Sequence, residues 1–172
     1  MTDSLSTVPL DLAWLLDATH DCIYVVDLGA DPLASRVVYV NSRVRDLLGY
    51  EPERFLEDPA FFGSIIHPDD MAGLMQATGV LLATRQPCTR TFRVLSGVTG
   101  EWKWVEDRVS VRSNAAGDVV GYQGIARDIT PRVEGQAALE ASEQRFQRYA
   151  ETTNDVMYRY RLTEPRGFEY VS

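Results

Sequence analysis

The stretch Gly-Ile-Ala-Arg-Asp-Ile-Thr-Pro joins a predicted strand to a predicted helix with almost no loop between them. The strand is expected over Val119–Ile129, and the helix begins directly after it. Thr130 is a good N-cap, and Pro131 suits the first helical position, where its missing N–H costs nothing. A strand connected so directly to an exit helix favours a domain that passes its internal state to a neighbouring segment.

The hydrophobic pattern before this junction predicts elements in the order β–β–α–α–α–β–β–β. The strands are expected at Cys22–Asp27, Arg36–Asn41, Thr89–Leu95, Glu101–Arg112 and Val119–Ile129. Helices are expected at Ser42–Leu48, in short pieces within residues 50–67, and after His67-Pro68. Because the helices follow the second strand, the order predicts the α+β class, with an antiparallel sheet and inserted helices.

Two further helical segments are expected outside this core. Leucines at helical spacing within residues 10–18 predict an N-terminal helical cap over residues 1–18. Beyond the junction, Leu139, Phe146 and Thr153 recur every seven residues, which favours a coiled-coil or docking helix over the linker 131–153. The alternative is a single amphipathic connector.

The end of the chain repeats its beginning. Thr153-Asn-Asp-Val-Met-Tyr158 matches Thr19-His-Asp-Cys-Ile-Tyr24, and a Tyr-Val pair follows in both copies after a shortened loop. Chance similarity between two hairpins is the alternative, but the preceding predicted helices also correspond, which favours a repeat. Residues 154–172 are therefore expected to begin a second domain that is cut short. Because an isolated hairpin is marginal in water, residues after about 155 are expected to be poorly ordered alone or to pair with the sheet edge of a partner.

Composition narrows the function classes. The 172 residues carry a net charge of −8 and no basic run, which argues against a nucleic-acid partner. No apolar run approaches the roughly 18 residues that a membrane helix needs, so no membrane contact is expected in this part of the chain. Cys22 and Cys88 fit no metal spacing or disulfide framework, and a cytoplasmic location is the expectation.

Six motifs occur in an order that resembles the PAS sensory domain family, of the subtype followed by a C-terminal motif. They are Asp21–Asp27, Tyr39–Asn41, Leu47-Leu-Gly-Tyr50, Ile66-His-Pro-Asp-Asp70, Gly100-Glu-Trp-Lys-Trp-Val-Glu106 and Gly124-Ile-Ala-Arg-Asp-Ile-Thr130. The resemblance covers residues 10–130, so residues 19–130 are expected to form one PAS domain, and the repeat resembles the start of a second.

The resemblance implies a five-stranded antiparallel sheet with a small-molecule cleft between the sheet and the helices. It also implies a binding or dimerisation module, expected here as a homodimer through the N-terminal or linker helices. In related proteins the signal leaves through the Asp-Ile-Thr motif into a helix. Downstream domains are commonly histidine kinases, diguanylate cyclases or cyclic-dinucleotide phosphodiesterases. A ligand-free structural dimerisation unit is the rival interpretation.

No enzyme is expected, because no nucleophile–base pair and no glycine-rich phosphate loop is present in the sequence. His67 precedes a helix start, where a capping or packing role is favoured over haem ligation. Glu106 and Asp107 are neighbours on a predicted strand and point to opposite faces, so they cannot share a proton. Neither cysteine lies in the motif of the flavin photoreceptors. The cofactor is unknown, and haem and photoreactive flavin are not expected.

A ligand cleft has candidate lining residues. Bulky side chains on the predicted strands and on the helix after His67 are combined with small residues that leave room beside them. The alternative is that these residues simply pack a core. The candidates are Met75, Phe92, Trp104, Tyr122, Gly124 and Ala126.

The junction itself provides the candidates for signal coupling, which are Asp128, Ile129 and Thr130. Asp128 ends the strand, where a charge-assisted bond to Arg108, Arg127 or a tryptophan N–H would hold the exit helix in register. The alternative is a solvated carboxylate that merely ends the strand. If the coupling interpretation is right, Asp128→Ala leaves the core folded and uncouples the downstream output.

Overall fold

The computed structural model describes residues 19–29, 35–152 and 158–171. Two compact units are distinguished, residues 1–130 and residues 131–172. The predicted N-terminal helix lies outside the described residues, as does Thr153 of the predicted heptad stripe. The boundary between the units falls at the predicted strand-to-helix junction.

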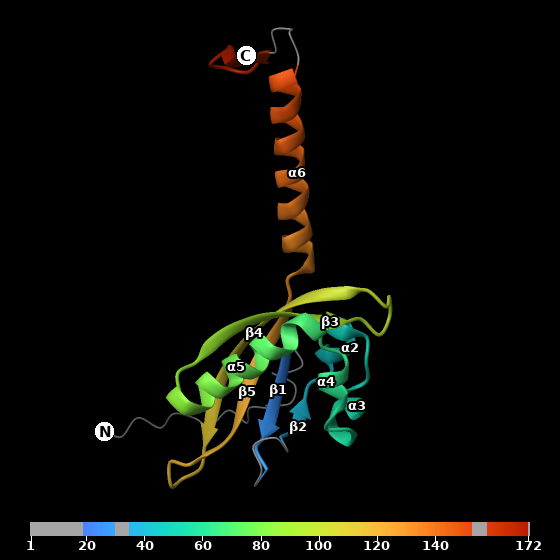
Figure 1. Cartoon of the computed structure of the whole chain (residues 1–172), viewed down its shortest axis with the longest axis vertical. Helices are drawn as coiled ribbons and strands as arrows, with labels where there is room; N and C mark the ends of the chain where they lie inside the picture. The colour runs from blue at the N-terminus through green and yellow to red at the C-terminus, as the bar shows by residue number, and fades with distance from the viewer. Residues whose placement is uncertain (1–18, 30–34, 153–157, 172) are drawn as a thin grey trace, which may run out of the picture. The chain divides into compact units, whose positions relative to one another are not determined.

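The first unit is a five-stranded antiparallel sheet with four helices inserted after the second strand (Figure 1). The strand order is β2-β1-β5-β4-β3. This confirms the predicted α+β class with its inserted helices. The strands are β1 (Cys22–Asp27), β2 (Arg36–Val40), β3 (Cys88–Leu95), β4 (Trp102–Ser113) and β5 (Val119–Asp128). The helices are α2 (Arg43–Leu48), α3 (Pro52–Glu57), α4 (Phe61–Ser64) and α5 (Pro68–Thr84).

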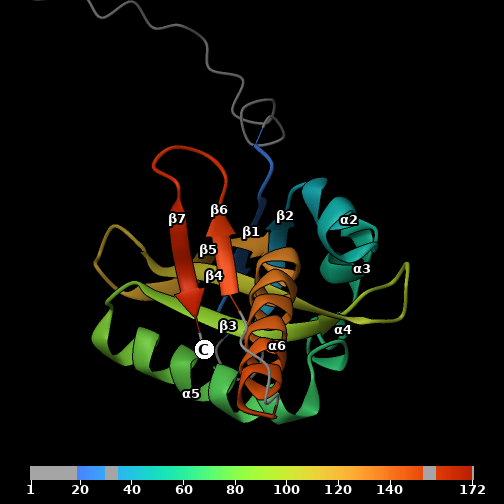
Figure 2. The same ribbon diagram turned by 90° about the horizontal axis from the view of Figure 1, so that it is seen from above.

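Helices cover one face of this sheet. Figure 2 shows α5 beside β3, while α2 and α3 lie near β1 and β2, in agreement with the contacts between these elements. The hydrophobic core lies between these helices and the sheet and includes Val44, Phe61, Phe92, Val94 and Val105. The strands alternate buried and exposed residues because only one of their faces meets the helices.

Helix α2 ends at Gly49, which adopts a left-handed conformation with φ 79° and donates its N–H to the Arg45 carbonyl at 2.8 Å. Only glycine adopts this conformation without strain, and it is a common helix stop. A Cβ at this position would also collide with Val98 Cγ2. The glycine therefore ends the helix and allows the β3–β4 turn to pass close by.

The start of α5 is capped by His67, as the sequence predicts. The His67 Nδ1 accepts a hydrogen bond from the Asp69 N–H at 3.2 Å, and Pro68 occupies the first turn. The His67 ring also lies edge-on to Trp102 at 4.5 Å between ring centroids. These contacts use the imidazole for helix capping and packing.

Asp70 holds α5 against β3. Its carboxylate accepts hydrogen bonds from the Arg93 backbone N–H at 2.8 Å, from Arg93 Nε at 2.9 Å and from Arg93 Nη2 at 2.8 Å. The side-chain bond from Arg93 is the main reason that the pKa of Asp70 is lowered. The side chain of Asp69, the preceding residue, is 76% exposed, whereas the side chain of Asp70 is only 18% exposed.

Asp70→Asn is expected to flatten the acid limb of the stability profile. A carboxyl whose pKa is lowered by folding contributes stability above its unfolded pKa, near 4, and loses that contribution as pH falls through the folded value. The wild-type advantage over the variant is therefore largest near neutral pH, begins to fall below the unfolded pKa and disappears once the pH is below the lowered folded pKa. Urea unfolding from pH 7 to pH 2.5 measures this. Asp69→Asn, at the exposed neighbour that lies 3.7 Å from Arg93 Nη2, too far for a hydrogen bond, should lower the stability at pH 7 less than Asp70→Asn does.

The second unit contains α6 (Thr130–Thr152), apart from its first residue, and a hairpin of β6 (Tyr158–Arg161) and β7 (Gly167–Val171). Helix α6 covers the predicted linker to within one residue of its start. Strand β5 ends at Asp128, one residue earlier than predicted. The hairpin lies where the repeat places a second pair of strands.

Candidate ligand cavity and signal junction

A cavity of about 500 Å³ lies between the helices and the sheet of the first unit. This volume is in the range of about 300–1,000 Å³ typical of small-molecule sites. Its wall is mostly apolar, and α5 contributes a stripe of residues at helical spacing. That stripe consists of Met71, Leu74, Met75, Thr78, Gly79 and Leu82.

Four of the six predicted pocket residues line this cavity: Met75, Phe92, Tyr122 and Ala126. Met75 comes from α5, Phe92 from β3, and the other two from β5. Trp104 and Gly124 are not part of the lining. The lining fixes where a ligand would contact the protein, and ligand binding by these residues stays a prediction.

Trp104 lies outside the lining because successive residues on a strand face opposite sides. Its neighbour Val105 lines the cavity, as does Asp107. The Trp104 ring instead lies 5.3 Å from the guanidinium carbon of Arg93, its cross-strand partner. This cation–π contact occupies the opposite face of the sheet.

Gly124 lies on the same face of β5 as Tyr122 and Ala126, but the Tyr24 side chain covers it. A Cβ at this position would meet the Tyr24 hydroxyl at 2.5 Å and Asp107 Oδ1 at 2.7 Å. The space that the glycine leaves is therefore filled by the tyrosine hydroxyl and its hydrogen bond to the carboxylate. Gly124 makes room for a polar contact inside the protein.

That contact belongs to a polar cluster at the cavity wall, formed by Tyr24, Thr78, Arg90 and Asp107. The Tyr24 hydroxyl lies 2.8 Å from Asp107 Oδ2 and accepts a hydrogen bond from Arg90 Nη2 at 3.0 Å. The Arg90 Nε donates to Asp107 Oδ2 at 3.0 Å, and its Nη1 donates to the Thr78 hydroxyl at 2.7 Å. The cluster links β1, α5, β3 and β4 through a single guanidinium.

The two charges of the cluster are almost completely buried. The Arg90 side chain is 6% exposed and that of Asp107 2%. Burial lowers the pKa of Arg90, but the oxygens of Tyr24 and Asp107 outweigh this effect and raise it above its usual value. Burial, followed by the Asp107 charge, raises the pKa of the Tyr24 hydroxyl well above its usual value. The tyrosine is therefore neutral and the arginine charged at pH 7.

Sequence reasoning missed this cluster, although a pattern pointed to it. Arg90 alternates with Phe92 and Val94 on β3, and Asp107 alternates with Val105 and Val109 on β4. Because strand residues two apart share a face, each charge is placed among buried side chains. Opposite charges at core positions of adjacent strands predict a buried ion pair.

Cys22 also lines the cavity, and its thiol is not ionised there. Burial, with the nearby charges of Asp107 and Asp21, raises the pKa of the Cys22 thiol to about 12, so the thiol stays protonated at pH 7.

Within the described residues, no group of three or more His, Cys, Asp or Glu side chains is placed to bind a metal ion. The described helices also include none long and apolar enough to cross a membrane.

Two hydrogen bonds of the Trp104 backbone hold the junction to β4, and a third bond lies within the junction. The Ile129 N–H donates to the Trp104 carbonyl at 2.9 Å, and the Trp104 N–H donates to the Thr130 hydroxyl at 2.8 Å. The Thr130 N–H donates to Asp128 Oδ1 at 2.8 Å. Thr130 thus uses its hydroxyl to bind the neighbouring strand, while Asp128 accepts the first N–H of the helix.

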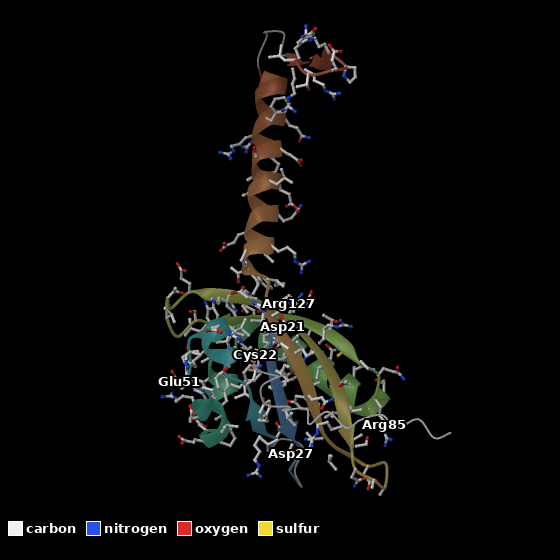
Figure 3. All side chains as sticks on the ribbon, turned by 180° about the vertical axis from the view of Figure 1, so that it is seen from behind. Asp21, Cys22, Asp27, Glu51, Arg85 and Arg127 are labelled. Atoms are coloured by element: carbon white, nitrogen blue, oxygen red, sulfur yellow. The ribbon has the colours of Figure 1, made fainter. Side chains whose placement is uncertain are left out.

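The predicted partners of Asp128 are wrong. Its Oδ2 pairs with Lys103 Nζ at 3.1 Å, and neither Arg108 nor Arg127 forms this contact. Arg127 instead pairs with Asp21 through two hydrogen bonds of 2.8 and 2.7 Å, and these two residues lie next to each other in Figure 3. Asp128 and Arg127 are successive strand residues that face opposite sides of the sheet, so their partners differ. The solvated-carboxylate alternative is excluded for Asp128.

The sheet order, the helices inserted after β2 and the cavity between them define an α+β sensor-type fold. Residues 37–126 match the model of the PAS fold family, and the chain belongs to this family. The match includes most of the cavity lining, the Arg90–Asp107 pair and most of β5, whereas the lining residues of β1 precede it. The family resemblance seen in the sequence is thereby confirmed.

Similar proteins agree with this assignment. The methyl sulfide methyltransferase-associated sensor of Methanosarcina acetivorans is 31% identical to this chain over the aligned region. That region is 66% of this chain and 11% of the length of that protein. The PAS domain of a Colwellia psychrerythraea protein aligns with a TM-score of 0.59 and 24% identity, covering 70% of this chain and 95% of that domain. An RNA-binding light-oxygen-voltage receptor aligns with a TM-score of 0.63 and 24% identity, covering 89% of this chain and 42% of that one. The two structures show similarity of fold alone.

Proposed function

We propose that this chain is the sensory part of a longer signalling protein. Its PAS domain binds a small molecule in the cavity and passes the bound state through Asp128, Ile129 and Thr130 to helix α6. It is a binding module without enzymatic activity and acts in the cytoplasm. The short fraction of the curated relative that it spans supports a longer protein with output domains.

One observation carries this proposal. Asp107 at the cavity wall and Trp104 at the junction lie on the same strand, β4. The Trp104 backbone makes hydrogen bonds to both Ile129 and Thr130. A ligand that moves the Arg90–Asp107 pair therefore acts on the strand that holds the start of α6. Because packed cores are bistable and not continuously deformable, a small displacement at the cavity is transmitted.

A second PAS domain after α6 is part of the proposal. Tyr24 pairs with Val40 in the first hairpin, as Tyr158 pairs with Val171 in the second. Both hairpins shift register at the same aligned place, between Val25 and Val26 and between Arg159 and Tyr160. A shared bulge at a matching position supports a repeated unit, because bulges are retained within families. Unlike the first hairpin, β6 and β7 form a two-stranded sheet of their own.

The second candidate function is ligand-free dimerisation. Among the described residues, every buried side-chain polar atom already has a hydrogen-bond partner, so no buried polar group needs a ligand. On α6, Leu139 and Phe146 are 54% and 39% exposed and lie seven residues apart. This spacing supports pairing of α6 with a second copy. Native mass spectrometry of the purified chain separates the two candidates by a bound small molecule or by a dimer without one.

Gly79→Leu tests the cavity. Gly79 lies on the cavity stripe of α5, and a Cβ there meets no atom within 4 Å. The leucine side chain is expected to fill part of the cavity and weaken ligand binding at least tenfold. Removing a helical glycine should at the same time raise the free energy of unfolding by about 0.5–1 kcal/mol. Calorimetric titration and urea unfolding measure the two effects.

Gly73→Leu is the matched control. Gly73 is also an exposed glycine of α5 with open space at its Cβ, but it does not line the cavity. This variant should gain the same helix stability and keep wild-type affinity. Equal loss of affinity in both variants would contradict binding in the cavity.

A further inference from the structure

The charge balance of the cavity wall restricts the ligand class. Among the lining residues, Arg90 and Asp107 are the two side chains that are charged at pH 7. The other ionisable lining groups are neutral, because the pKa values of Cys22, Tyr24 and Tyr122 are all raised, chiefly by burial. The wall therefore has no net charge.

The guanidinium of Arg90 is committed to the protein. Its Nε and Nη2 donate to Asp107, Nη2 also donates to Tyr24, and Nη1 donates to Thr78. Thr78 in turn donates its hydroxyl to the Leu74 carbonyl at 2.8 Å. An anionic ligand would have to compete with Asp107, which is fixed on β4, for this cation. A cationic ligand would have to compete with Arg90 for Asp107 in the same way.

We infer that the cavity takes an uncharged, largely apolar small molecule and rejects carboxylates and amines of the same shape. This inference rests on the proposed function. Moving a charge out of water into an apolar site without a partner is strongly unfavourable, and here both possible partners are already paired. Apolar area, in contrast, is favourable to bury against the methionine, leucine and phenylalanine side chains of the wall.

Three probes of one shape test the inference: 4-phenylbutan-1-ol, 4-phenylbutanoate and 4-phenylbutylammonium. Each is titrated at pH 7 into the wild-type chain and into Gly79→Leu, with calorimetry as the measurement. The alcohol is expected to bind at least tenfold more tightly than either ion, and Gly79→Leu should weaken its binding. Gly73→Leu should bind the alcohol as the wild type does.

A charge variant extends the test. Asp107→Asn leaves the Arg90 guanidinium without its counter-ion, so the carboxylate probe should gain at least tenfold in affinity relative to the alcohol. The double variant Arg90→Gln/Asp107→Asn, in which the wall is again uncharged, should restore the preference for the alcohol. These ratios compare probes on the same protein and are independent of its stability as long as the variant is folded, which circular dichroism checks.

The outcomes separate the inference from the proposed function. Binding of an ion as tight as that of the alcohol, weakened by Gly79→Leu, would overturn the neutral-ligand inference and leave the cavity as a binding site. Failure of all three probes to bind, or binding that Gly79→Leu leaves unchanged, would count against the proposed binding function itself. In that case the neutral-ligand inference would fail together with the proposed binding function.

Discussion

Asp107→Ala is expected to lower the free energy of unfolding by about 3–5 kcal/mol, because it leaves the buried Arg90 guanidinium without a counter-ion. The two side chains are almost fully buried and are linked by two hydrogen bonds. Arg90→Met should have an effect of similar size, since it leaves Asp107 unpaired. Urea unfolding followed by tryptophan fluorescence measures both losses.

Two further variants provide the controls. Tyr24→Phe removes one hydroxyl that bonds to both charges but keeps the ion pair, so its loss should be smaller, about 1.5–3 kcal/mol. The double variant Arg90→Met/Asp107→Ala should lose less than the sum of the single variants, with a coupling of about 0.5–3 kcal/mol. If Asp107→Ala proved as mild as Tyr24→Phe, the pair would not be the buried, desolvated contact described above.

Thr130→Val is the second variant with a large expected effect. It keeps the shape of the side chain and removes the oxygen that accepts the Trp104 N–H at 2.8 Å. Leaving a partly buried N–H unsatisfied costs about 1–3 kcal/mol. The Trp104 amide should therefore exchange with deuterium roughly 10–100 times faster, and the first turn of α6 should lose protection with it.

Thr130→Ser, which retains the hydroxyl, is the control and should keep wild-type protection at Trp104. The neighbouring bond from the Ile129 N–H to the Trp104 carbonyl is unchanged in both variants. Slow exchange of the Trp104 amide in Thr130→Val would argue against the junction as the connection between β4 and α6. In the full-length protein, the valine variant should also respond less to the signal.

The strands were predictable because their apolar residues alternate. Phe92 and Val94, for example, lie two residues apart and are both buried under the helices. The strand ends and the helix stop at Gly49 depend on local backbone preferences, which a sequence carries by itself. The split of residues 50–67 into α3 and α4 was expected only as unspecified short pieces, because such short helices are stabilised by tertiary packing.

The candidate site was predictable only in part. Met75, Phe92, Tyr122 and Ala126 follow from residue type and from the face of each element. Trp104 was placed in the cavity for its size, although its position on β4 puts it on the other face of the sheet. The alternation that excludes Trp104 from the cavity also places Asp107 in its wall. If strand alternation had been given priority over residue size, Trp104 would have been left out of the cavity and Asp107 placed in its wall.

Gly124 illustrates what alternation alone does not resolve. It shares a face of β5 with Tyr122 and Ala126, yet the Tyr24 hydroxyl covers it from β1. Likewise, the partner of Asp128 depends on Lys103 reaching it from β4. Both contacts join residues far apart in the chain, and their distances depend on sheet register.

By itself the sequence determined the family, the order of strands and helices, and the position of the junction between β5 and α6. These features depend on periodicity, turn residues and short motifs, which are local along the chain. The tertiary structure alone decided which charges meet and where the cavity lies. Arg90 meets Asp107 because β3 and β4 pair in one register, with Arg90 directly opposite Asp107. A shift of β3 by one residue would turn Arg90 to the outer face and leave Asp107 without it, so only the folded sheet creates the neutral polar wall of the cavity.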